Sequence, residues 1–207
     1  LQGVTGSRPG TLSISAIKAL GMDKAALLVR ALCQQQQLPM PASVHVTELL
    51  QKQLHADADR QIHVTWPGGE FRRYHDDLYI QAPLPETDND DWQYQWDGNG
   101  EILIPEYHGC LSLHACTSGG IRKSLVDAGL VVRPRLGGER CRPVGDRHRR
   151  DLKVIFQQLA IPPWERRRLP LIYHGEDLLA IADLVICQSA VAAANQPGYQ
   201  VRWKSIN

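Results

Sequence analysis

The sequence predicts an α+β protein of two modules: a helical module with a terminal β-hairpin, followed by a sheet-rich module with one main helix. Two patterns support this fold class, namely helical spacing of apolar residues in the N-terminal part and strand-like alternation beyond it. An acidic, proline-bearing stretch separates the two patterns. We therefore expect a helical module at 1–82, a linker at 83–91 and a sheet-rich module at 92–207.

The helical module begins where apolar residues take up helical spacing, at Thr11. The pattern indicates two short amphipathic helices that break near Gly21. A connector at 38–41 carries two prolines, which fix their own φ angles and favour extended geometry before them. Ser43 then suits the N-cap of a third helix, because its hydroxyl can accept a free backbone N–H.

The spacing changes to strand-like alternation at Gln61. Ile62, Val64 and Trp66 alternate with polar residues, which predicts a strand. A Pro-Gly-Gly turn at 67–69 leads to returning strand segments at 71–74 and 78–80. The first module is therefore expected to be a helical bundle that ends in a small β-meander.

The second module shows short apolar segments at strand spacing, separated by turn residues. Strands are expected at 92–96, 102–104, 111–113, 130–132, 169–173, 178–186 and 199–203. One helix is expected at 149–160, where Pro162 and Pro163 end it.

Composition and cysteine content exclude some classes of protein. The chain has 207 residues, of which 43% are hydrophobic and 22% are charged. Its formal net charge is +1, so the overall charge of the protein does not indicate a type of binding partner. No apolar run approaches the roughly 20 residues of a membrane span. The sequence opens without Met or a signal peptide, and we expect it to start within a longer protein or to be processed. Five cysteines without a CxxC pair favour reduced thiols and a cytoplasmic location.

The strongest local feature is a basic segment, residues 133–168, which holds eleven of the 23 Lys and Arg residues against four acids. Ten of the eleven are Arg, whose planar fork suits phosphate. Gly137 and Gly138 allow close backbone approach and can turn N–H groups toward an anion. The loop also leads into the N-terminus of the expected helix, which favours anions. The alternative interpretation is a solvated charged face with local carboxylate partners. The net charge of +7 over the segment favours binding of a nucleic-acid backbone instead.

Other motifs give weaker signals. Ser118-Gly119-Gly120 begins like a pyrophosphatase loop, but Arg122 and Lys123 stand where that loop needs Asp and Ser, so a plain hairpin turn is favoured. The alternating residues His108, Cys110, His114 and Cys116 could imitate a zinc site, although their spacing suits a half-buried strand better, and we expect no metal.

Three further assignments follow from local sequence. Arg72 and Arg73 are expected to form surface ion pairs with Asp76 and Asp77. Cys141 could have a lowered thiol pKa in the basic loop, but packing under the loop is favoured. Four tryptophans are expected to be core or domain-interface anchors rather than base-stacking platforms, namely Trp92, Trp96, Trp164 and Trp203.

The second module strongly resembles the C-terminal domain of bacterial tRNA(Ile)-lysidine synthetase. The resemblance rests on the run VVRPRLGGER at 131–140, on Leu152-Lys153, and on IPPW at 161–164 with Arg166, Arg168 and the following Leu-Pro-Leu. The helical module looks like the helical substrate-binding domain of the same enzyme through Arg30, the 38–41 connector and residues 71–79. Together these similarities cover most of 12–203.

The resemblance implies a function in tRNA recognition. The family enzyme uses ATP to adenylate the wobble cytidine of tRNA(Ile) and attaches lysine to it. Its catalytic domain carries SGGxDS, which this sequence lacks. The resemblance therefore implies that the chain is the C-terminal part of the enzyme and that it docks tRNA rather than catalysing the reaction. By itself the chain is expected to be inactive. ATP with Mg²⁺ would bind the missing domain, and no cofactor is expected here. The expected partners are tRNA(Ile) and that catalytic domain, with no membrane.

By this interpretation, the tRNA-binding residues come from the basic segment. They are Arg133, Arg135, Gly137, Gly138, Arg140, Arg142, Arg149, Arg150, Lys153, Arg166 and Arg168. Arg166 and Arg168 could instead fix the loop by salt bridges. The alternative functions are a stand-alone basic module that binds a protein or another nucleic acid, and an intact small enzyme with an unrecognised site.

Overall fold

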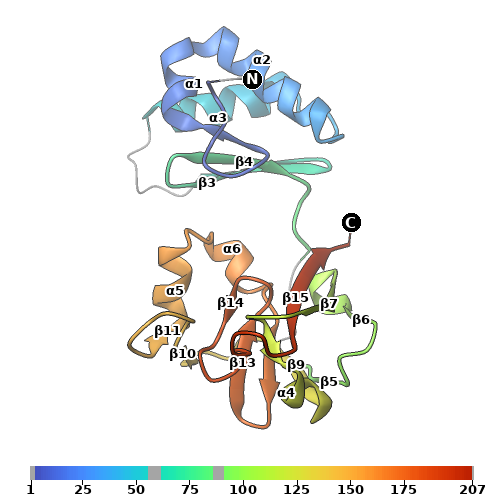
Figure 1. The fold of residues 1–207 in the computed structure, drawn as a ribbon. Helices are drawn as coiled ribbons and strands as arrows, with labels where there is room; N and C mark the ends of the chain where they lie inside the picture. The colour runs from blue at the N-terminus through green and yellow to red at the C-terminus, as the bar shows by residue number, and fades with distance from the viewer. Residues whose placement is uncertain (1–2, 56–61, 86–90, 207) are drawn as a thin grey trace. The chain divides into compact units, whose positions relative to one another are not determined.

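The computed structural model describes residues 3–55, 62–85 and 91–206. The chain forms two compact units, Leu1–Pro85 (unit 1) and Glu86–Asn207 (unit 2). The division falls inside 83–91, where the sequence predicts a linker; residues 86–90 lie outside the described part of the chain. Helices and antiparallel sheets occur in both units, and the predicted α+β class is confirmed (Figure 1).

In unit 1, residues 3–55 and 62–85 form a four-stranded antiparallel sheet with three helices on one face (Figure 1). The helices are α1 (Ile14–Leu20), α2 (Met22–Gln35) and α3 (Ser43–His55). The strands are β1 (Thr11–Ser13), β2 (His63–Trp66), β3 (Gly69–Tyr74) and β4 (Asp77–Gln81), in the order β1-β4-β3-β2. The core between helices and sheet includes Val29, Leu49 and Phe71, each fully buried.

The start of unit 1 differs from the prediction. Thr11–Ser13 is a strand paired with β4, not the first turn of a helix. The pairing gives the edge of β4 a hydrogen-bonded neighbour. This tertiary contact, and not the helical spacing of the local sequence, decides the conformation of residues 11–13. Ser13 then caps α1, since its side chain accepts the Ala16 N–H at 3.2 Å. The helices are therefore a layer on the sheet rather than a bundle that precedes it.

The described residues of unit 2 form two larger sheets and one small hairpin, all antiparallel. The five-stranded sheet has the order β14-β13-β12-β9-β5 and the four-stranded sheet the order β6-β7-β15-β8. The strands are β5 (Tyr94–Trp96), β6 (Glu101–Ile104), β7 (Gly109–Cys116), β8 (Ile121–Arg122), β9 (Leu130–Arg133), β10 (Arg140–Cys141), β11 (Arg150–Asp151), β12 (Leu171–His174), β13 (Asp177–Ile181), β14 (Val185–Ile186) and β15 (Gly198–Ser205). The helices are η1 (Pro105–Tyr107), α4 (Lys123–Asp127), α5 (Leu152–Gln158) and α6 (Pro163–Arg166).

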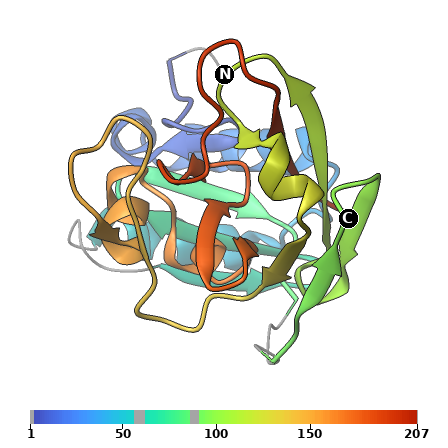
Figure 2. The ribbon, with the colours of Figure 1, turned by 60° about the horizontal axis from the view of Figure 1, so that its bottom comes forward.

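The five-stranded sheet is covered on both faces. Apolar residues such as Ile172 pack with Leu111 and Val201 of the four-stranded sheet in one core cluster. On the other face, Leu171 packs with Ile155 and Phe156 of α5 in a second cluster. Figure 2 shows the long connection that leaves β9 and reaches α5. The basic segment is thus built around the α5 side of the sheet.

The predicted main helix is shorter than expected. Arg150 and Asp151 form β11, and α5 begins only at Leu152, because pairing of β11 with β10 extends the backbone before the helix. Pro163 does not simply end a helix but opens α6, where its missing N–H costs nothing.

The turn at Ser118–Gly120 is not a plain hairpin turn either. β7 and β8 pair with opposite sides of β15, so the turn crosses the start of that strand. A Cβ at Gly198 would meet the Gly119 carbonyl oxygen at 2.6 Å, which explains a glycine there. No helix in the described residues is long and apolar enough to cross a bilayer.

Candidate nucleic-acid interface

The basic segment forms a hairpin followed by a short helix. In the hairpin, Arg140 faces Asp151 and Cys141 faces Arg150 across β10 and β11. The exposed loop at 142–149 joins the two strands, and Lys153 lies in the first turn of α5. Figure 1 labels β10, β11 and α5 together on one side of unit 2. We call 140–153 the arginine hairpin.

The loop of the arginine hairpin is anchored to the segment that follows β14. The Gln188 N–H donates to the Arg142 carbonyl at 2.7 Å, and the Val144 N–H donates to the Ile186 carbonyl at 3.2 Å. The Gly145 N–H donates to the Gln188 side-chain oxygen at 3.1 Å. These bonds place the loop without help from its charged side chains.

A disulfide joins the same two segments. Cys141 bonds to Cys187, 46 residues later, and both are buried. The expectation of five reduced thiols is therefore wrong for this pair; Cys33, Cys110 and Cys116 are free. The spacing gave no sign of the bond, because only the fold brings β10 beside the end of β14. The bond also removes Cys141 as a candidate low-pKa thiol.

Two of the predicted phosphate contacts, Arg133 and Arg135, are partly buried against aromatic rings. The Arg133 guanidinium lies 3.8 Å from the centre of the Tyr173 ring and 3.8 Å from the Glu176 carboxylate. Burial raises the pKa of Tyr173, and the nearby Arg133 charge only partly offsets this. The Arg135 guanidinium lies 5.6 Å from the centre of the buried Phe156 ring. Both arginines pack on aromatic faces of the unit 2 core.

The backbone donors around Gly137 already hold a carboxylate. The N–H groups of Leu136 and Gly137 donate to one oxygen of Glu139 at 2.6 and 2.8 Å. Arg135 donates to the other oxygen at 3.3 Å. Gly137 and Gly138 have φ angles of +102° and +81°, a left-handed turn that glycine adopts readily. The anion that these N–H groups bind here belongs to the chain itself.

Arg140 and Arg149 are held by exposed contacts, and Arg150 is held by a partly exposed ion pair. Arg140 and Arg149 each donate to the other's backbone carbonyl at 3.4 Å. Arg140 also lies 3.2 Å from Asp151, in a pair whose side chains are 58% and 63% exposed. Arg150 pairs with Asp146 at 3.1 Å. Exposed ion pairs contribute about 0–1 kcal/mol, so these guanidinium groups can exchange a carboxylate for a phosphate at low cost.

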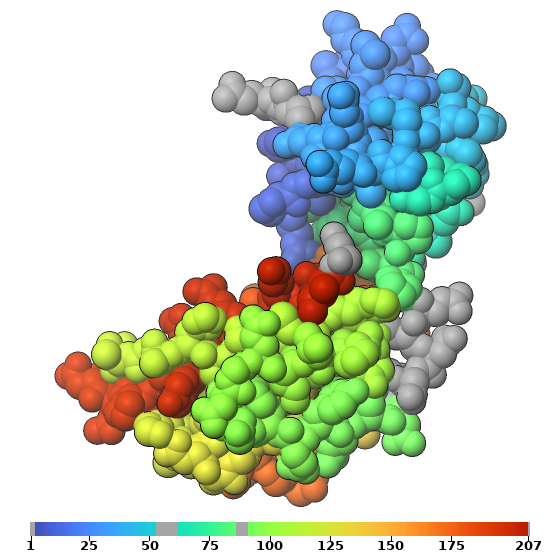
Figure 3. Space-filling view, turned by 90° about the vertical axis from the view of Figure 1, so that its right-hand side faces the viewer, coloured from blue at the N-terminus to red at the C-terminus, as the bar shows by residue number. Residues whose placement is uncertain are grey.

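The exposed cations Arg142, Arg147, Arg149 and Lys153 have no ion-pair partner among the described residues. Arg147 was not among the predicted contacts, because nothing in the sequence distinguished its position from its neighbours. The structure places it in the exposed loop between Arg142 and Arg149. Figure 3 looks onto a different face of unit 2, formed largely by green residues together with red residues from the C-terminal part of the chain.

The last two predicted contacts lie in and after α6. Arg166 donates from Nε to the Ile161 carbonyl at 2.7 Å, and the Arg168 N–H donates to the Glu165 carbonyl at 2.9 Å. Both side chains are partly exposed. Arg166 thus helps to close the connection between α5 and α6 through a hydrogen bond to the backbone.

The residues at Ser118–Gly120 do not fit a nucleotide phosphate. A Cβ at Gly120 would lie 2.6 Å from the Tyr199 carbonyl oxygen, so the turn packs directly on β15. Arg122 donates to the Ser189 carbonyl at 2.6 Å. Nor is there, in the described residues, a group of three or more His, Cys, Asp or Glu that could hold a metal. His108 lies at the end of η1 with a φ of +47°, outside β7.

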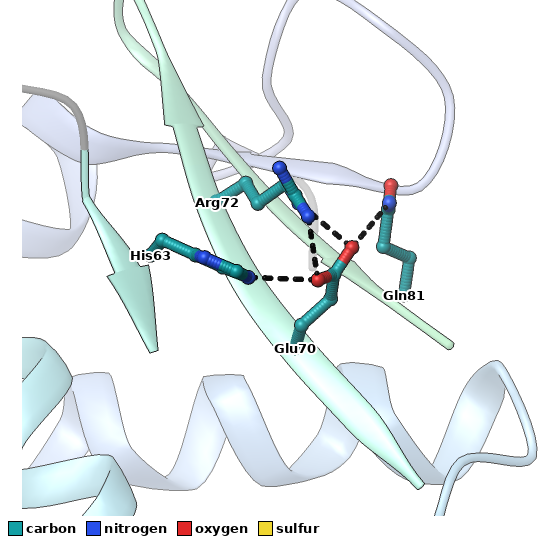
Figure 4. A network of polar contacts seen from close by, with 4 residues as sticks. All are labelled: His63, Glu70, Arg72 and Gln81. Atoms are coloured by element: carbon teal, nitrogen blue, oxygen red, sulfur yellow. Dashed lines mark hydrogen bonds and ion pairs between the residues drawn. The ribbon is translucent and has the colours of Figure 1, made fainter. Parts of the chain in front are cut away.

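A separate polar cluster lies on the sheet of unit 1. Glu70 accepts hydrogen bonds from Arg72 at 2.7 and 2.9 Å, from Gln81 at 2.9 Å, and shares one with His63 at 2.8 Å (Figure 4). Burial raises the pKa of Glu70, but these hydrogen bonds outweigh it and the net pKa is lowered. Arg72 therefore pairs with Glu70, whereas pairs with Asp76 and Asp77 were predicted.

Comparison with known proteins assigns both units. The family description "TilS substrate binding domain" matches residues 12–79, and "TilS substrate C-terminal domain" matches residues 130–203. The chain belongs to the tRNA(Ile)-lysidine synthase (TilS) family. The expected family is therefore confirmed, and the arginine hairpin lies inside the second TilS match.

Curated relatives carry the same family name. The tRNA(Ile)-lysidine synthase of Alkalilimnicola ehrlichii is 36% identical over 199 residues, covering 93% of this chain and 42% of the relative. That of Xylella fastidiosa is 32% identical and covers 96% of this chain and 44% of the relative. The chain thus spans less than half the length of these relatives. A solved TilS C-terminal domain covers 56% of this chain and 99% of its own, with a TM-score of 0.43 and 18% identity.

Proposed function

We propose that this chain is the tRNA-recognition portion of a lysidine synthetase, and that the arginine hairpin contacts the phosphates of tRNA(Ile). One observation carries the proposal: several exposed cations without a carboxylate partner lie together on a hairpin inside the TilS substrate C-terminal match. Arg142, Arg147 and Arg149 come from the loop and Lys153 from the adjoining helix. Guanidinium forks bind phosphate oxygens with charge-assisted hydrogen bonds.

In this proposal, the complete enzyme converts the wobble cytidine to lysidine with lysine and ATP in the cytoplasm. ATP and Mg²⁺ bind in a catalytic domain, since the Ser118–Gly120 turn does not fit a nucleotide phosphate. The role of this chain is to hold the tRNA so that the anticodon reaches that domain. The chain therefore binds tRNA without modifying it.

The proposal is tested by the salt dependence of binding to a tRNA(Ile) transcript. Log Kd should rise linearly with log salt, with a slope of about 0.7–0.9 for each phosphate engaged. Arg142→Ala and Arg149→Ala should each weaken binding and reduce the slope by about one. Arg202→Ala on β15, another exposed arginine of unit 2, is the matched control and should leave the slope unchanged.

Two rival functions give different results. A protein-binding module would show little affinity for the transcript at any salt concentration, and footprinting would protect no region of the tRNA. An intact small enzyme would form lysidine when the chain alone is mixed with tRNA, lysine and ATP. Either outcome would exclude the docking function.

A further inference from the structure

We propose that Glu139 is a positioning residue for the arginine hairpin, so that removing this negative charge weakens RNA binding instead of strengthening it. The inference rests on the proposed function of the hairpin. It also separates the basic segment into two parts. Residues 133–139 form a support whose two arginines pair with Glu176 and Glu139, and the arginine hairpin forms the surface that contacts phosphate.

The Glu139 side chain is bound from three sides. It is only 11% exposed, and its two oxygens receive the Leu136 and Gly137 N–H groups and the Arg135 guanidinium. A carboxylate with these donors fixes the backbone turn that the two glycines allow. The same donors are therefore not available to a phosphate unless Glu139 leaves.

Arg135 links this turn to the core of unit 2. Its guanidinium lies between Glu139, at 3.3 Å, and the Phe156 ring, at 5.6 Å from the ring centre. Phe156 is fully buried in α5. The contact chain from Phe156 through Arg135 to Glu139 thus holds the turn against the helix.

The backbone of Glu139 connects the turn to the arginine hairpin. Its carbonyl accepts the N–H of Leu152, the first residue of α5, at 3.1 Å. The next residue, Arg140, opens β10 and faces Asp151 in β11. Glu139 therefore sits where both strands of the arginine hairpin and the start of α5 meet, and its side chain sets the position from which the hairpin projects.

Simple electrostatics predicts the opposite change in RNA affinity when the Glu139 charge is removed. A carboxylate near a phosphate-binding surface repels RNA, so its removal should tighten binding if Glu139 only adds charge or blocks the N–H groups. The burial and the three donors argue against easy displacement of this carboxylate. Asp151 supplies the contrast, because it is 63% exposed and, within the described part of the chain, its ion pair is with the exposed Arg140.

The test compares Glu139→Gln with Asp151→Asn in the full chain, by tRNA(Ile) binding at several salt concentrations. Both substitutions remove one negative charge from the same region. We expect Glu139→Gln to weaken binding about tenfold and to reduce the salt slope by about one, as for a lost phosphate contact. Asp151→Asn should leave binding unchanged or tighten it, because it releases Arg140.

Further variants exclude a merely structural effect. Thermal melts of each variant report folding, and a lowered melting temperature with unchanged affinity and salt slope would overturn the proposal. Arg135→Ala should weaken binding similarly, and the double variant with Glu139→Gln should be little worse than either single one, because both act through one turn. Tighter or unchanged binding by Glu139→Gln would also overturn it.

Failure of the proposed function gives a different pattern. The wild-type chain and the Arg142→Ala variant would then show no salt-dependent difference in tRNA binding. Glu139 would still be tested by hydrogen exchange. Loss of protection at the Leu136 and Gly137 amides in Glu139→Gln would show that the carboxylate holds the turn, and retained protection would contradict it.

Discussion

At the scale of single residues, Glu70 shows how unit 1 accommodates a buried charge. Its side chain is 3% exposed and collects hydrogen bonds from Arg72, Gln81 and His63, which come from three neighbouring strands. A buried carboxylate is stable only when such donors replace water. Because they favour the ionised form, the pKa of Glu70 lies below its ordinary value of 4.5.

We therefore predict that Glu70→Gln destabilises unit 1 in a pH-dependent way. A lowered pKa in the fold means that the stabilisation is complete above pH 4.5 and is lost as pH falls through the folded value. The substitution should lower the free energy of unfolding by about 2 kcal/mol at neutral pH. The difference in the free energy of unfolding between this variant and the wild type should shrink in acid. Denaturation followed by the NMR signals of unit 1 measures it.

Glu48→Gln is the matched control for that measurement. Glu48 forms an i,i+4 ion pair with Lys52 on α3 and is 43% exposed. Its loss should cost at most about 0.5 kcal/mol. Equal effects of the two substitutions on the free energy of unfolding would show that the Glu70 cluster contributes no more stability than a surface ion pair.

At the scale of elements, the link between β10 and the end of β14 is held twice, by a disulfide and by backbone hydrogen bonds. We predict three reactive thiols in the denatured, unreduced chain, those of Cys33, Cys110 and Cys116, and five after reduction. A thiol titration that gives five before reduction would contradict the bond.

Reduction of this disulfide should lower the free energy of unfolding more than it weakens the free energy of tRNA binding. Release of a 46-residue loop costs about 4 kcal/mol in the chain-entropy model. The bonds from Gln188 to Arg142 and from Val144 to Ile186 do not involve sulfur and still place the loop. Thermal melts and tRNA titrations with and without dithiothreitol measure both effects; an equal loss of binding would show that the disulfide alone positions the loop.

The elements also show what sequence could and could not predict. Strand β2 was predicted because it buries alternate residues, a pattern read locally. Strands β3 and β4 are buried along most of their length and were predicted as the segments that return from the Pro-Gly-Gly turn. Strand β1 and the β10–β11 hairpin were missed, since two or three residues leave no period and their pairing depends on distant partners.

For the candidate site, composition predicted the basic segment but not its internal division. Arg133 and Arg135 resemble Arg142 and Arg149 in sequence, yet the first two pack on aromatic rings and the last two lie in or beside an exposed loop. Only the tertiary positions of Tyr173 and Phe156 distinguish them. The same applies to Glu139, which reads as a local partner for arginine and lies at the junction of the turn, β10 and α5.

At the scale of the whole molecule, each unit has its own core. Unit 1 buries residues such as Val29, Leu49 and Phe71, and unit 2 builds two clusters around its five-stranded sheet. Among the described residues, every member of a core cluster packs within its own unit. Separate cores are the property of domains that can fold alone.

We therefore predict that residues 86–207, expressed alone, fold and retain most of the salt dependence of tRNA binding. The reason is that the arginine hairpin, its support at 133–139 and the anchoring Gln188 all lie in unit 2. Residues 1–85 should also unfold cooperatively, because they enclose a complete helix-on-sheet core. Salt titrations of the fragment and the full chain should give slopes that differ by less than one phosphate contact, about 0.9. A folded fragment whose slope falls further would place phosphate contacts in unit 1, and an unfolded fragment would show that the units depend on each other for stability.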